Sequence, residues 1–110
     1  MYVGAIELDI LLGDVRSLKE KRSAVRPIVA ELRRRFEVTA AEAGHLEKYR
    51  RTLIGVAAVA AGAEHVREVL DACERLVAER PELELLSVRR RWLGPNDESG
   101  PTMNRSEGRG

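Results

Sequence analysis

The first twelve residues alternate between apolar and polar side chains, which is the pattern of a strand with one buried face. Ile6, Leu8 and Ile10 share one face, and Glu7 and Asp9 lie on the other. Three later stretches are also rich in aliphatic or small residues and are bounded by Gly, Pro or polar residues. The pattern therefore predicts four strands, over residues 2–12, 36–43, 51–60 and 83–93.

Two segments between these strands repeat apolar residues every three or four positions, as amphipathic helices do. The first begins after Ser17, which forms a capping box with Glu20, so that each residue's side chain accepts from the other's amide. Pro27 lies opposite the apolar stripe, on the solvent side, and predicts one kinked helix, with two short helices as the alternative. The second helix is predicted over 63–79 and ends before Pro81.

The resulting order is strand, helix, strand, strand, helix, strand, which is the order of a ferredoxin-like fold. We expect an α+β protein with a four-stranded antiparallel sheet and two helices on one face. In this topology the first strand lies between the third and the fourth. Glu7 and Asp9 would then face the same side as Arg89 and Arg91, where opposite charges can pair across strands.

The chain of 110 residues is long enough to bury one hydrophobic core, and 44% of its residues are apolar. Its formal net charge of +1 points to no class of partner by itself. We expect one domain over residues 1–94 and a disordered polar tail over 95–110. Because no signal peptide and no long apolar run is present, we expect a cytoplasmic location without membrane contact.

The sequence contains no recognisable catalytic motif. Cys73 is the only cysteine, and it lies within an apolar helical stripe, which is typical of an inert core residue. His45 and His65 have neither a nucleophile nor enough converging ligands in their local sequence to form a site. The sequence therefore predicts a protein that is not an enzyme and that has no metal and no cofactor.

Positive charge is concentrated in the first helix and just before it. Residues 16–35 contain eight basic side chains and only two acidic ones, and a row of cations on one flank of a helix suits phosphates. A solvated helix face presents the same pattern, and the sequence leaves both interpretations open. The residues predicted to contact nucleic acid are Lys19, Lys21, Arg22, Arg26, Arg33, Arg34, Arg35, Arg50 and Arg51.

Two short stretches resemble the YlxP-like family of small bacterial proteins: residues 2–8, YVGAIEL, and residues 17–22, SLKEKR. The resemblance extends over residues 1–93 and implies a ferredoxin-like fold. It also implies genes that lie beside those of transcription-elongation, translation-initiation and ribosome-maturation factors. It implies no catalytic residues, since none is established for the family. The turn from His45 to Tyr49 departs from the acidic turn that is usual there.

Two functional hypotheses follow. In the first, the protein is a non-enzymatic accessory protein that binds RNA or a ribosomal subunit through the basic flank of the first helix. In the alternative, it is a homo-oligomeric module, such as a homodimer, that binds a protein partner or a small ligand through the open sheet face. The apolar residues expected on that face are Val3, Ala5, Leu11, Leu83 and Leu85.

Overall fold

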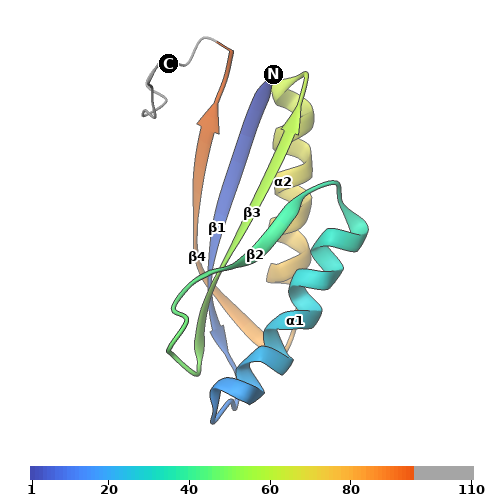
Figure 1. Ribbon diagram of the computed structural model, residues 1–110. Helices are drawn as coiled ribbons and strands as arrows, with labels where there is room; N and C mark the ends of the chain where they lie inside the picture. The colour runs from blue at the N-terminus through green and yellow to red at the C-terminus, as the bar shows by residue number, and fades with distance from the viewer. Residues whose placement is uncertain (96–110) are drawn as a thin grey trace.

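The computed structural model describes residues 1–95, and these form strands and helices in the predicted order (Figure 1). The elements are β1 (Tyr2–Leu12), α1 (Leu18–Arg35), β2 (Thr39–Gly44), β3 (Arg51–Ala60), α2 (Ala63–Ala78) and β4 (Leu83–Leu93). All pairings are antiparallel, and the strand order is β2-β3-β1-β4. The predicted α+β ferredoxin-like layout is confirmed. Residues 96–110 of the predicted tail lie outside the described residues.

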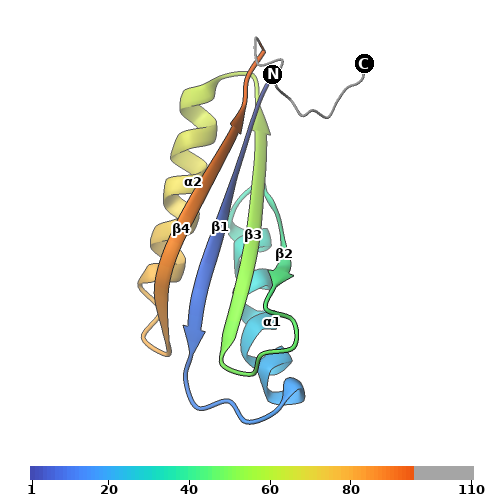
Figure 2. The same cartoon turned by 90° about the vertical axis from the view of Figure 1, so that its left-hand side faces the viewer.

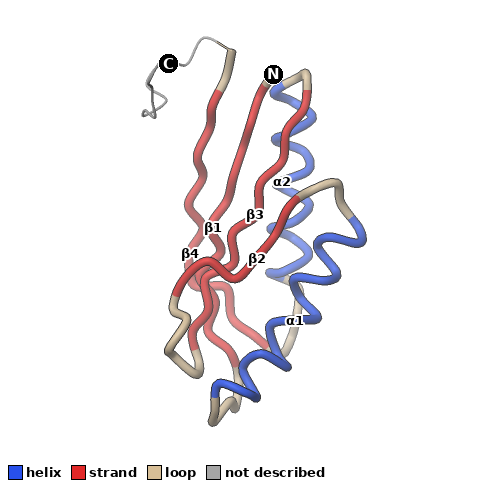
Figure 3. The backbone as a smooth tube through the Cα atoms, in the orientation of Figure 1, coloured by secondary structure: helices blue, strands red, loops and turns tan. Residues whose placement is uncertain are grey.

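The protein has two layers, a twisted sheet and a pair of helices that cover one of its faces (Figures 2 and 3). No element of the described chain covers the other face. No helix within residues 1–95 is long and apolar enough to cross a membrane. The core lies between the layers and is made mainly of Ile6, Leu8, Ile10, Val25, Ile28, Leu32, Ile54, Val56, Val66, Leu70, Cys73 and Val77.

Helix α1 begins as predicted, except for one contact. The Ser17 hydroxyl accepts a hydrogen bond from the Glu20 amide at 3.1 Å. The Glu20 carboxylate, however, accepts from the amide of Arg16 at 2.8 Å and not from that of Ser17, so the return contact is shifted by one residue. Pro27 lies inside the helix on its exposed side, and the prediction of a single helix is confirmed.

Strand β4 contains a bulge that reverses its inward and outward positions. Asp9 pairs with Ser87, but the next residue, Ile10, pairs with Leu85, which leaves Leu86 without a partner and 42% exposed. An extra residue of this kind exchanges the two faces of a strand on one side of the bulge. The prediction that Leu83 and Leu85 face outward is therefore wrong, because both pack against the core.

Gly4 allows α2 to approach β1 closely. A Cβ atom at this position would lie 2.6 Å from Val66 Cγ1 and 2.8 Å from Leu70 Cδ1, inside any normal contact distance. Gly55 on β3 is different, because a Cβ there would meet Ala43 Cβ at an ordinary 3.4 Å. The absence of a side chain thus has a packing role at Gly4 but not at Gly55.

We predict that Gly4→Ala lowers the free energy of unfolding by about 1–3 kcal/mol, the usual effect of overpacking a core. Gly55→Ala is the matched control and should be neutral or slightly stabilising, because alanine reduces the freedom of the unfolded chain. Urea unfolding followed by circular dichroism would measure both. Equal midpoints for the two variants would show that α2 does not depend on the gap at Gly4.

Candidate functional site

A buried ion pair joins α1 to the sheet. Lys21 is only 2% exposed, and its ammonium lies 2.9 Å from Glu42 Oε2 on β2. The same carboxylate oxygen accepts a hydrogen bond from the hydroxyl of buried Thr52 on β3 at 2.8 Å. Lys21 also donates to the carbonyl of His45 in the turn after β2. A charge this deeply buried needs partners of this kind, and those of Lys21 lie on β2 and in the turn that follows it.

The ion pair contradicts the predicted phosphate-binding role of Lys21. The repeat of the first helix turns this residue toward the sheet, about 100° away from the flank on which Arg22 lies. Its ammonium is shielded from solvent and already engaged. Lys21 therefore has a structural role, and it does not belong to the exposed cationic surface.

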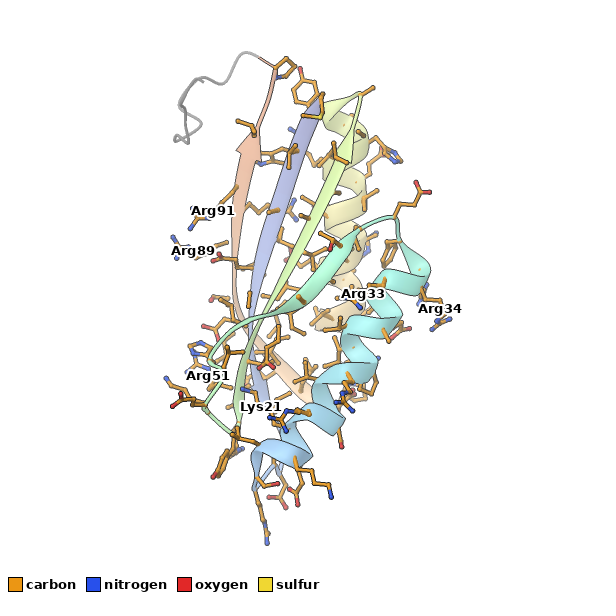
Figure 4. All side chains as sticks on the ribbon, in the orientation of Figure 1. Lys21, Arg33, Arg34, Arg51, Arg89 and Arg91 are labelled. Atoms are coloured by element: carbon orange, nitrogen blue, oxygen red, sulfur yellow. The ribbon has the colours of Figure 1, made fainter. Side chains whose placement is uncertain are left out.

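Arg51 also forms an ion pair within the protein. It lies near the turn after β2, on the uncovered face of the sheet, and both oxygens of Asp9 accept from its guanidinium at 2.9 Å (Figure 4). Burial acts to raise the pKa of Asp9, but the hydrogen bonds and charge of Arg51, with help from His45, lower that pKa overall. The pair thus contributes stability at neutral pH that is lost as the pH falls through the lowered pKa.

The charges expected to pair across β1 and β4 do so only in part. Glu7 stands opposite Arg89 in the register, and the guanidinium of Arg91 lies 4.0 Å from the Glu7 carboxylate. Asp9 instead turns toward β3 and binds Arg51. Arg89 and Arg91 project from β4, away from α1, as Figure 4 shows.

The other predicted contact residues differ in their position and in their internal partners. Arg35 pairs with Glu31 at 3.3 Å, and Arg50 donates to the carbonyl of Gly13 at 3.0 Å. Arg34 is exposed on the outer side of α1 (Figure 4). The residues that remain together on one flank of α1 are Lys19, Arg22, Arg26 and Arg33, and all four are exposed. We call these four residues the basic flank.

A groove of about 530 Å³ runs between α1 and β2, and three members of the basic flank line it. Its wall on α1 combines arginines with aliphatic side chains, and its wall on β2 contains Glu42. The lining residues are Arg22, Val25, Arg26, Val29, Ala30, Arg33, Ala41 and Glu42. The site is thus a cationic groove with apolar patches and one carboxylate.

Arg33 is held in place at this groove. Its Nε donates to the carbonyl of Ala40 on β2 at 3.0 Å, and Figure 4 shows the side chain between α1 and β2. Its two terminal nitrogens have no protein partner among residues 1–95. A guanidinium fixed at one end, with free donors at the other, is well suited to bind an anion.

Other chemistry has little support in the described part of the chain. Within residues 1–95, no three His, Cys, Asp or Glu side chains are grouped so that they could hold a metal ion. Burial raises the pKa of the Cys73 thiol to about 11, so the thiol stays protonated and unreactive at neutral pH. The arginine-lined groove remains the strongest candidate site.

Comparisons with known proteins give the family of this chain. The profile of a family described as "Protein of unknown function (DUF503)" matches residues 3–90. The chain belongs to the DUF503 family. It is 29% identical over 91 residues to the "Uncharacterized protein YlxP" of Bacillus subtilis (strain 168), a match that covers 83% of this chain and 99% of that protein. The predicted resemblance to the YlxP-like family is confirmed, and neither description names an activity.

For this DUF503 protein, sequence reasoning found the arginines of the groove but missed its other wall. Ala30 and Ala41 gave no signal, because small residues are common on any surface. Glu42 could have been found, because an acid at an inward position of a strand needs a cationic partner. The partner, Lys21, lies at the matching inward position of the helix.

We predict that Lys21→Met lowers the free energy of unfolding by about 3 kcal/mol, the low end for a broken buried pair. The effect is at the low end because the Glu42 side chain is still 22% exposed to water. Lys19→Met is the matched control on the same helix and should change the stability by less than about 0.5 kcal/mol. Urea unfolding of both variants measures the difference, and equal midpoints would refute the structural role of Lys21.

Proposed function

We propose that this protein is a non-enzymatic RNA-binding protein that acts on RNA or ribosomal subunits through the basic flank of α1. The observation that carries the proposal is the distribution of ion pairs. Lys19, Arg22 and Arg26 have no acidic partner within residues 1–95, whereas several arginines outside the basic flank do, namely Arg51, Arg67, Arg80 and Arg90. Arg80, for example, pairs with Glu31 and Glu82 at 2.6 Å.

The basic flank also goes against the usual design of a solvated helix. Exposed helix faces commonly place acids and bases four residues apart, because such pairs stabilise the helix slightly. Arg22 and Arg26 are four residues apart and carry the same charge, so they repel each other weakly. A bound phosphate backbone would remove this repulsion and would release counterions on binding. Contacts of this type position a protein on RNA and carry little sequence information.

We predict that the double variant Arg22→Gln/Arg26→Gln binds ribosomal subunits and total RNA more weakly than the wild type. It should also lower the slope of log affinity against log salt by about 1.4, since each phosphate contact on a single strand contributes about 0.7. Filter binding between about 50 and 200 mM salt would measure both quantities. Arg33 is left intact in this variant because it also holds β2.

The matched control is Arg75→Gln/Arg89→Gln, which removes the same charge from two exposed arginines outside the groove. It should bind RNA with an unchanged salt slope. If both double variants lost affinity equally, binding would depend on overall charge and not on the basic flank. If the wild type failed to bind any RNA at low salt, the proposal would be wrong.

A second candidate function is favoured by the uncovered face of the sheet, which we propose packs against a second copy of the chain. At one end of this face Val3 lies between Val59 and Leu93, and in the next row Ala5 stands opposite Ala57. Val59 is 60% exposed. The small side chains would let a second sheet approach closely, as in face-to-face packing of two sheets.

In this case Val59→Glu should convert a dimer into a monomer, because the variant would bury a charge without a partner. Light scattering at micromolar concentration measures the mass directly. Leu46→Glu, at an equally exposed position in the turn after β2, is the control and should remain dimeric. A monomeric mass for the wild type would eliminate this candidate.

A further inference from the structure

The groove beside α1 contains features that a purely electrostatic contact with RNA does not need. Neutralising a phosphate backbone requires cations, and these need not surround a hollow. Here Arg22, Arg26 and Arg33 border a hollow of about 530 Å³ whose lining also includes Val29 and Ala30. This volume is within the range of small-molecule sites, which combine apolar walls with a few polar groups.

We propose that the groove binds an unpaired nucleotide of single-stranded RNA, with the base in the hollow and the neighbouring phosphates on the arginines. This inference rests on the proposed RNA-binding function and adds the form of RNA that is recognised. Unpaired bases can leave the stack and enter a protein site, whereas bases in a duplex cannot. In the absence of an aromatic side chain in the groove, an arginine plane supplies the stacking surface.

Arg33 gives this proposal its first support. The guanidinium is anchored through Nε to the carbonyl of Ala40, so its position is restrained before any ligand arrives. The same hydrogen bond occupies a backbone acceptor of β2, the strand at the edge of the sheet. A peptide strand that added to this edge would compete for such acceptors, so the contact favours a nucleotide over an extended acidic peptide as the occupant. A nucleotide needs only the free terminal nitrogens of Arg33.

Glu42 gives the second support. Lys21 and Thr52 both bind its Oε2 atom, which leaves Oε1 without a protein partner among residues 1–95. A carboxylate oxygen beside a nucleotide accepts a hydrogen bond from an exocyclic amino group, as in the contact with cytosine N4. Adenine, cytosine and guanine carry such a group, whereas uracil has a carbonyl oxygen in its place, which a carboxylate repels, and only its ring N3–H as a donor. The groove should therefore discriminate against uracil.

The test uses the full chain and labelled oligoribonucleotides of about twelve residues, a length that spans a typical single-strand site. Fluorescence anisotropy would compare oligo(C), oligo(U) and a duplex of the same length. We expect oligo(C) to bind about tenfold more tightly than either, since one well-placed base contributes a difference of this order. Equal affinity for all three would overturn the inference and leave the proposed RNA binding intact.

A variant that fills the hollow without changing charge provides a separate test. Ala30→Leu should reduce the affinity for oligo(C) about tenfold while leaving the salt slope unchanged, since the phosphate contacts remain. Ala78→Leu, at an exposed position on α2, is the matched control and should bind like the wild type. Thermal unfolding would confirm that both variants are folded. Unchanged binding by a folded Ala30→Leu variant would overturn the inference.

Competition identifies the source of the nucleotide. Cytidine monophosphate offers a single phosphate, so it should displace labelled oligo(C) only at concentrations far above that of the strand. Displacement at comparable concentrations would show that the ligand is a free nucleotide. Displacement by polyglutamate at comparable concentrations would show that the groove takes an acidic peptide. Either result would overturn the single-strand proposal. Failure of every RNA to bind at low salt would instead refute the proposed function itself.

Discussion

The Lys21–Glu42 ion pair is the contact on which the arrangement of the site depends. It links α1 to β2, and through Thr52 and the His45 carbonyl it also links α1 to β3 and to the turn after β2. Measured against a well-packed apolar pair, a buried ion pair adds little net stability. The pair restricts the position of α1, however, because a buried charge is strongly destabilising unless it contacts its partner. We infer that the pair mainly fixes where α1 lies against β2, at the edge of the sheet.

This constraint explains why a groove exists beside β2. Arg33 makes a second contact between the same two elements, about three helical turns after Lys21, through the carbonyl of Ala40. The two contacts hold α1 beside the edge strand at both ends of the hollow, and small residues between them leave the space unfilled. Each contact uses a cationic side chain. The ammonium of Lys21 is buried and fully engaged, whereas Arg33 uses only its Nε atom. Arg22 and Arg26, which lie between these attachments, have no internal partner in the described chain.

The sequence predicted the elements well because each has a strong local signal, such as the alternation in β1 and the cap at Ser17. It failed where the outcome depends on a contact between distant residues. The bulge at Leu86 results from the pairing of β4 with β1, and it reversed the predicted direction of Leu83 and Leu85. Likewise, the nine predicted contact residues were chosen by charge alone. Charge does not reveal that Lys21 has a partner 21 residues later in β2.

The distinction between paired and unpaired cations is what the structure adds to the amino-acid sequence. The near-neutral net charge does not show which cations are paired. Arg51, Arg80 and Arg90 each form an ion pair within the protein. Such arginines keep their partners only at a cost in desolvation, and they are poorly available to a ligand. The exposed cations of the basic flank have no acidic partner in the described chain, so a phosphate bound there, as we propose, would compete with water and salt and not with internal ion pairs. In the binding mode that we propose, the affinity of the groove would come from its arginines and the selectivity from Glu42, the residue whose position is set by the buried ion pair.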